Sequence, residues 1–147
     1  MTVKKLYLHI GWRKTGSSAI QHLITKNIHD GLFLGIRVPA SGSTAQKLVT
    51  GGSPIAHHGL ANDKKDGLWE ENWDGLASEV SSGGDGEYLV SSEIFSFVMG
   101  KDDGYIAALA RKLKLFDEVV VFCWLRRQDQ FMNSLRVQKA KHGGVQN

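Results

Sequence analysis

The chain contains few of the residues that build crosslinked or metal-stabilised proteins. Its 147 residues include one cysteine, two prolines and six histidines. The single cysteine, Cys123, excludes a disulfide within the chain, and the apolar residues around it predict a small buried side chain. The histidines are not accompanied by paired cysteines or an H-E-x-x-H spacing, so we expect no metal site.

Charge and hydropathy exclude further classes. The net charge is +3, without the basic stripe and interleaved aromatics of a nucleic-acid-binding surface, so no nucleic-acid partner is expected. The apolar segment near the N-terminus is interrupted by His9 and ends at Gly11, which is too short for a signal peptide. No long apolar run predicts a membrane span. We therefore expect one cytoplasmic α/β domain over residues 1–147, with no membrane partner.

An apolar strand, a glycine-bounded loop and a helix follow one another at the start of the chain. The G-x-x-x-x-G frame of a P-loop runs from Gly11 to Gly16. Ser17 occupies the position of the Walker lysine, and the cation lies inside the loop as Lys14. This displacement disfavours ordinary ATP hydrolysis, because the Walker lysine reaches the β- and γ-phosphates. The helix N-terminus, with hydroxyls from Thr15, Ser17 and Ser18, still favours a phosphate or sulfate-like anion.

The remaining segments alternate between strand and helix patterns. We expect strands at 32–38, 88–93 and 118–125, and helices at 68–80, 102–116 and 128–141. The first helix should end near Asp30-Gly31, and Pro39 should stop the strand at 32–38. The continuous apolar run at 118–125 suits a central parallel strand. The alternation predicts a three-layer α/β fold, P-loop-like, with a central parallel sheet flanked by helices.

Apolar side chains recur at helical spacing in three of these helices and predict their buried faces. They are Ile20, Leu23, Ile24 and Ile28 in the first helix; Trp69, Trp73, Leu76 and Val80 in the next; and Ile106, Leu109, Ala110 and Leu113 in the third.

Two polar groups outside the loop are further candidates for the site. The segment 40–67 is too long for a plain connector and is expected to be an excursion on the substrate side. Within it, His57 and His58 either bind an acceptor hydroxyl or are simply solvent-exposed. Glu93 follows a predicted strand, where polar groups face the ligand crevice. It is a candidate general base, although capping the next helix or pairing with Lys14 or Arg126 is an equal alternative.

The segment K-T-G-S-S after a short strand resembles the 5′-phosphosulfate loop of sulfotransferases that use 3′-phosphoadenosine 5′-phosphosulfate (PAPS). The bacterial branch, which opens with H-I-G-x-x-K-T-G-[ST]-[ST], is the best match. The resemblance implies that the donor's phosphosulfate is held by Arg13, Lys14, Thr15, Gly16, Ser17 and Ser18. It also implies that Arg126 and Ser134 hold the 3′-phosphate, because the family places an arginine at a strand end and a serine eight positions later. Taken alone, Arg126-Arg127 reads as a solvated surface pair.

The activity implied by the resemblance is in-line transfer of a sulfuryl group from PAPS, as co-substrate, to the hydroxyl of a carbohydrate or small molecule. Glu93 would take the hydroxyl proton, Lys14 would stabilise the leaving oxygen, and no metal would be needed. Family members usually continue past the arginine strand with another basic, glycine-containing loop, and no such segment follows Ser134. A fragment, a truncated product and a minimal domain that needs a partner all stay open.

Two other functions remain as alternatives. One is a P-loop kinase-like phosphotransferase, which would need magnesium and an acid at a strand end, where this chain has arginines. The other is a non-catalytic remnant that binds an adenine nucleotide or a protein partner. An incomplete domain would expose apolar surface, and a homo-oligomer is one way to cover it.

Overall fold

The computed structural model of the chain describes residues 3–12, 15–43, 54–62, 67–100, 103–125 and 127–141. Within these ranges the chain forms strands and helices with the following bounds: β1 (Lys4–His9), α1 (Ser17–Asn27), β2 (Leu32–Phe33), β3 (Ile36–Arg37), α2 (His58–Ala61), α3 (Leu68–Gly83), β4 (Gly86–Ser91), α4 (Ile94–Met99), α5 (Asp103–Leu113), β5 (Glu118–Phe122) and α6 (Gln128–Lys141).

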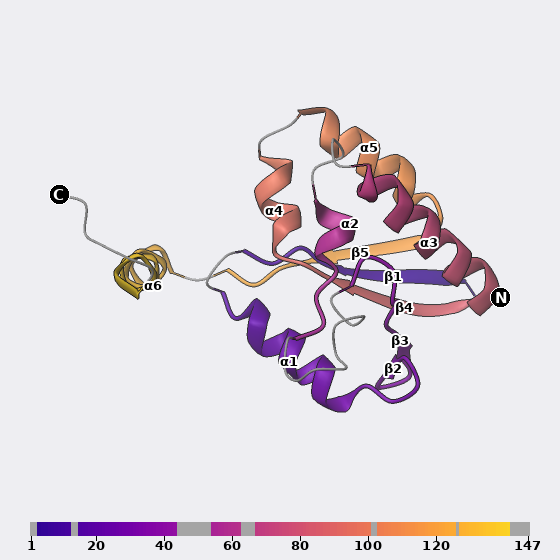
Figure 1. Ribbon diagram of the computed structural model, residues 1–147, viewed down its shortest axis with the longest axis horizontal. Helices are drawn as coiled ribbons and strands as arrows, with labels where there is room; N and C mark the ends of the chain where they lie inside the picture. The colour runs from indigo at the N-terminus through magenta and orange to yellow at the C-terminus, as the bar shows by residue number, and fades with distance from the viewer. Residues whose placement is uncertain are drawn as a thin grey trace.

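The strands form one mostly parallel sheet in the order β2-β3-β4-β1-β5. β1 pairs in parallel with both β4 and β5, and β3 pairs in parallel with β4. The last residue of β1, His9, lies opposite Ser91 on one side and Phe122 on the other. The carboxyl ends of β4, β1 and β5 therefore meet at one edge of the sheet (Figure 1). The expected α/β class with a central, mostly parallel sheet is confirmed.

Helices cover both faces of this sheet (Figure 1). Side chains alternate between the faces along a strand. Leu6 and Leu8 of β1 accordingly belong to the core under α3 and α5, whereas Tyr7 packs with the smaller cluster around Ile24 of α1. The predicted apolar face of α3 is confirmed, and each of its four side chains is at most 2% exposed: Trp69, Trp73, Leu76 and Val80.

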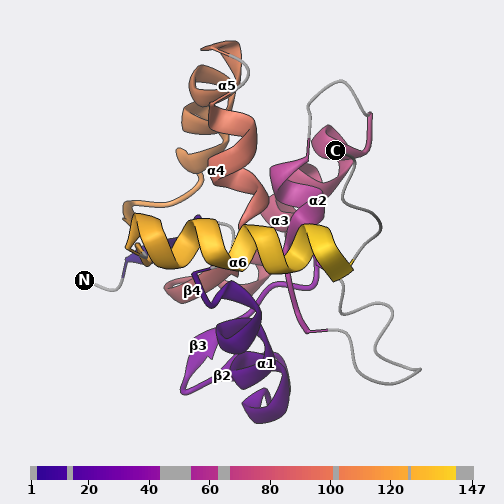
Figure 2. The ribbon, with the colours of Figure 1, turned by 90° about the vertical axis from the view of Figure 1, so that its left-hand side faces the viewer.

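The connections that leave the two central strands run to opposite faces. After β1 the chain enters α1 on one face, and after β4 it enters α4 and α5 on the other before it reaches β5 (Figure 1). Such a divergence at the carboxyl ends of neighbouring strands opens a crevice, which is where α/β proteins bind ligands. Figure 1 shows α6 lying beyond this edge, apart from the layered part of the fold, and in Figure 2 the same helix runs across the front of the view.

The segment after α1 differs from the expected single strand at 32–38. The chain forms β2 and β3 there, and these two strands pair antiparallel to each other. The reversal occurs at Leu34 and Gly35, whose φ angles are 53° and 83°. Two consecutive left-handed residues make the tight turn of a hairpin. The first helix also ends at Asn27, before the expected Asp30-Gly31.

The strand β5 is at the edge of the sheet and not at its centre, so that part of the prediction is wrong. Val121 is 52% exposed, and Cys123, expected to be buried, is exposed. An apolar run is typical of a strand that has a neighbouring strand on each side. Here β5 pairs with β1 on one side, and no strand among the described residues pairs with its other side.

The buried faces of α1 and α5 are each rotated from the expected pattern. In α1, Leu23 is 55% exposed, and the polar Gln21 is buried in its place. In α5, Ile106 is 54% exposed, and the buried positions are Tyr105, Ala108 and Leu109. Within the described residues, no helix has the length and apolar character needed to cross a membrane.

Candidate functional site

The loop between β1 and α1 is closed by a glycine in a left-handed conformation. Gly16 is the N-cap of α1 with φ 95° and ψ 11°, and it supplies no side-chain hydrogen bond to the helix. Thr15 folds back on the loop, because its Oγ1 donates a hydrogen bond to the carbonyl oxygen of Trp12. The first N–H groups of a helix have no intrahelical acceptor. This helix therefore presents main-chain donors, and the positive end of its dipole, at the crevice.

The residues expected to hold the donor's phosphosulfate are described only in part. Ser17 is buried and Ser18 is exposed, both in the first turn of α1. Arg13 and Lys14 lie outside the described residues. The hydroxyl and the main-chain N–H of Thr15 both donate to the carbonyl oxygen of Trp12, so in this structure neither is available to an anion.

Two buried polar atoms near this helix terminus have no hydrogen-bond partner among the described residues. They are Nε2 of His9, at the end of β1, and Oγ of Ser17, in the first turn of α1. Both face Gly11. A Cβ at Gly11 would lie 2.5 Å from Oγ of Ser17 and 3.2 Å from Nε2 of His9. Glycine at this position is therefore what allows the imidazole and the hydroxyl to approach the same part of the loop.

A second pair of polar side chains joins α1 to the end of β4. Nε2 of Gln21 donates a hydrogen bond to Oε2 of Glu93 over 3.0 Å. Gln21 is 2% exposed and Glu93 is half-buried, so the amide orients the carboxylate at the crevice. Burial lowers the pKa of His9, whereas the negative charge of Glu93 acts in the opposite direction. Glu93 thus lies within electrostatic reach of the imidazole.

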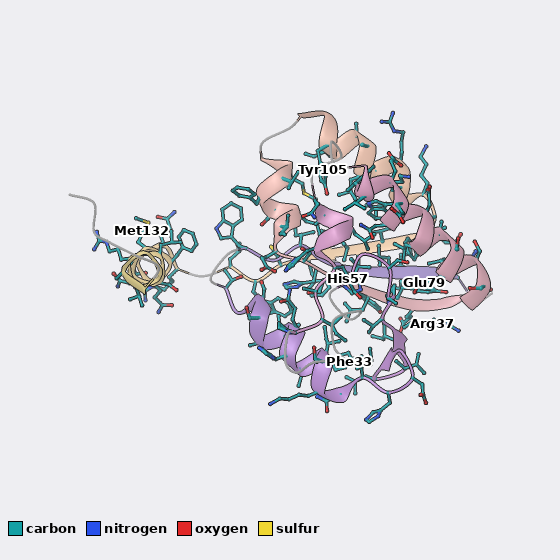
Figure 3. The ribbon with its side chains drawn as sticks, in the orientation of Figure 1. Phe33, Arg37, His57, Glu79, Tyr105 and Met132 are labelled. Carbon is teal, nitrogen blue, oxygen red and sulfur yellow. The ribbon has the colours of Figure 1, made fainter. Side chains whose placement is uncertain are left out.

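The two adjacent histidines occupy different environments. His57 is 1% exposed, its Nε2–H donates to the carbonyl oxygen of Pro39, and its Nδ1 accepts from the N–H of Ser91. Figure 3 shows His57 in the interior of the fold. With both ring nitrogens bound to backbone, His57 fastens the segment before α2 to β4 and presents no ring nitrogen to an acceptor.

His58 is better placed for a ligand than His57. It is half-buried, and its Nδ1 lies 2.8 Å from Oγ of Ser92, directly after β4. The same Oγ accepts a hydrogen bond from the N–H of Ile94. Ser92 therefore ties the imidazole of His58 to the start of α4. The rest of the expected excursion is described only at residues 40–43, 54–62 and 67.

The residues expected to hold the 3′-phosphate are not brought together by the described structure. Arg126 lies outside the described residues, and Ser134 is a half-buried residue of α6. Met132 on the same helix is 50% exposed, and Figure 3 shows it apart from the rest of the fold. A cavity of about 400 Å³ lies between α6 and the loop. It is lined by Trp12, Thr15, Leu125, Gln128 and Phe131.

Three residues of this site were not predicted from the sequence: His9, Gln21 and Ser91. Each is a polar side chain at a position where the pattern calls for an apolar one. His9 and Ser91 end the two central strands, and Gln21 lies one turn before Ile24 on the buried face of α1. Such interruptions of an apolar face, next to a glycine-bounded loop, are the signal that would have identified them. In the described part of the chain, no group of three or more His, Cys, Asp or Glu side chains could hold a metal ion.

Comparison of the chain with known proteins found no relative. The chain matches no family model, no curated protein and no solved structure.

Proposed function

We propose that this chain carries the donor site of a PAPS-dependent sulfotransferase with a P-loop-like fold. The observation that carries the proposal is a pair of buried polar atoms, His9 Nε2 and Ser17 Oγ, which have no hydrogen-bond partner among the described residues. They lie at a helix N-terminus that has no side-chain cap. Leaving a buried polar group without a partner costs about 1–3 kcal/mol. An oxyanion at this terminus would accept hydrogen bonds from both side chains and from the main chain of α1.

The sequence of the loop favours a sulfuryl donor over ATP. A Walker loop places lysine directly after its second glycine, where it reaches the phosphates. Here that position is Ser17, a buried hydroxyl in the first turn of α1. A loop with hydroxyls at the helix and its cation at Lys14 suits a phosphosulfate, whose transferred group carries less charge than a γ-phosphate.

In the proposed reaction an acceptor hydroxyl attacks the sulfur atom of PAPS in line with the bridging oxygen. The new bond joins the acceptor oxygen to sulfur, and the bond from sulfur to the bridging oxygen breaks. Glu93 takes the hydroxyl proton, and Gln21 holds its carboxylate in place. Lys14 stabilises the negative charge that develops on the bridging oxygen. The products are a sulfate ester and 3′,5′-adenosine bisphosphate.

The rest of the donor and the acceptor have proposed contacts as well. Arg126 and Ser134 hold the 3′-phosphate, since a guanidinium and a hydroxyl both donate to phosphate oxygens. The cavity of about 400 Å³ between the loop and α6, lined in part by Leu125 and Phe131, is of a size that suits a nucleoside. His58 is the remaining candidate for an acceptor contact.

The test is calorimetric titration of the full chain with 3′,5′-adenosine bisphosphate and, separately, with ADP and magnesium. The proposal expects tighter binding of the bisphosphate, with loss of that preference in Arg126→Ala and of most affinity in Lys14→Ala. Arg136→Ala, an exposed arginine of α6, is the matched control and should bind as the wild type does. Preference for magnesium-ADP would support the kinase-like alternative. Binding of neither nucleotide would refute a donor site and leave a non-catalytic remnant.

A further inference from the structure

His9 is enclosed at the carboxyl end of the central strand β1. Its side chain is 1% exposed. The imidazole stacks on the ring of Phe122 at 5.3 Å between centroids and meets the edge of Trp124 at 5.1 Å. Nδ1 lies 2.8 Å from Oγ of Ser91 on the neighbouring strand. The ring is therefore fixed in orientation, and only Nε2 faces the loop.

The loop side of this imidazole carries a donor or acceptor that no described residue of the chain satisfies. Nε2 has no partner among the residues that the structure describes, and neither has the nearby Oγ of Ser17, whose side chain is 6% exposed. Gly11 lies against both atoms. Buried polar groups in native proteins nearly always have partners, and a helix N-terminus is a place where a bound anion supplies them.

The position of His9 beside a helix N-terminus determines which tautomer of its imidazole can bind an anion. A helix N-terminus attracts negative charge, and the oxygens of an anion are hydrogen-bond acceptors. Nε2 must therefore carry a proton to contact the anion, because a lone pair would repel it. The hydroxyl of Ser91 provides this arrangement if it donates to Nδ1, which leaves the proton of a neutral imidazole on Nε2. Burial lowers the pKa of His9, which keeps the ring neutral at pH 7.

We infer that His9 binds the oxyanion held at the N-terminus of α1, through a hydrogen bond from its Nε2–H, with Ser91 fixing the tautomer. The ligand chemistry is a sulfate or phosphate oxygen. The inference rests on the proposed function only for the identity of the molecule that carries this oxygen. It makes His9 a binding residue beside Ser17, and separates its role from that of Glu93, which takes a proton.

The first test is nitrogen-15 NMR of the full chain with labelled histidines at pH 7. Sodium sulfate, sodium pyrophosphate and 3′,5′-adenosine bisphosphate are added in turn at constant ionic strength, and the His9 signals are assigned from their loss in His9→Gln. We expect Nε2 to be the protonated nitrogen and its signal to shift with added anion, whereas the signal of His22, which is exposed on α1, stays unchanged. A proton on Nδ1, or an unchanged His9 signal while the amides of α1 shift, would overturn the inference.

The second test compares the anion affinity of His9→Leu with that of His9→Gln. Leucine removes the donor, and glutamine keeps an N–H near the position of Nε2. Loss of a hydrogen bond to a charged group predicts roughly 10- to 100-fold weaker binding in His9→Leu, partly restored in His9→Gln. His22→Gln is the control, and circular dichroism checks that each variant folds. If His9→Leu does not fold, the NMR titration of the wild type decides alone.

The outcomes separate this inference from the proposed function. If pyrophosphate shifts the His9 signal but adenosine bisphosphate does not bind, the donor proposal fails and the oxyanion contact stands. If the bisphosphate binds equally well to wild type and His9→Leu, the donor site stands and the role of His9 is refuted.

Discussion

The buried His57 predicts that the protein loses stability as the pH falls below neutrality. Burial lowers its pKa from 6.5 to about 4, although the hydrogen bond to Pro39 and the charge of Glu79 favour protonation. Protonation of Nδ1 would also bring two N–H groups face to face, because that nitrogen accepts from the main chain of Ser91.

The sign follows from comparing the folded and unfolded chains. The unfolded chain takes up a proton at His57 near pH 6.5, and the folded chain does so only near pH 4. Between these values the unfolded state binds more protons, so acidification favours unfolding. The difference corresponds to a loss of about 2 kcal/mol between pH 7 and pH 5, and of about 3 kcal/mol by pH 4. The lowered pKa of His9 adds to the loss in the same direction.

Urea unfolding at pH 7, 6, 5 and 4.5 measures this effect, with fluorescence of the buried Trp69 and Trp73 as the signal. The His57→Gln variant should be less stable at pH 7 but should show a clearly shallower fall toward pH 5. His22→Gln, a substitution of an exposed histidine, should keep the wild-type slope. The reasoning is refuted if wild type and His57→Gln lose stability in parallel, or if the wild type gains stability between pH 7 and pH 5.

Further substitutions test the packing and the loop. Leu76→Ala, at a fully buried position, should lower the unfolding free energy by about 2–5 kcal/mol in urea. Gly11→Ala should lower stability and abolish anion binding in calorimetry, because its Cβ would overlap Ser17. Gly16→Ala meets no neighbouring atom, so it should cost only the left-handed strain of an alanine, about 1–2 kcal/mol, in the same assays. Lys112→Met breaks a surface ion pair and should change urea stability by less than about 1 kcal/mol.

The sequence was most informative where one face of an element is wholly buried. The spacing of Trp69, Trp73, Leu76 and Val80 predicted the inner face of α3 correctly, because four large apolar side chains leave one orientation for the helix. It was least informative about turns and edges. Leu34 adopts a left-handed φ that leucine seldom adopts, so an apolar run concealed a hairpin. The edge position of β5 depends on which strands pair, and the residues of β5 alone do not predict that pairing.

The candidate site was predicted in outline and not in its buried polar contacts. The glycine-bounded loop and the polar end of β4 both lie at the crevice, as parallel strands require. The role of His57 could not be read from its neighbours in sequence, because both of its hydrogen bonds are to distant backbone at Pro39 and Ser91. The contacts of His9 and Gln21 likewise depend on β4. These contacts of His9 and Gln21 could be identified only from the register of the strands, which brings the partner residues together.

The central claim is that the N-terminus of α1 is an oxyanion site for the phosphosulfate end of a PAPS-type donor. Amide nitrogen-15 spectra of the full chain, recorded while 3′,5′-adenosine bisphosphate is added, test this most directly. We expect the largest shifts at the amides of Gly16, Ser17 and Ser18, and we expect them to saturate with one ligand per chain. Saturating shifts elsewhere, with these three amides unchanged, would contradict the claim.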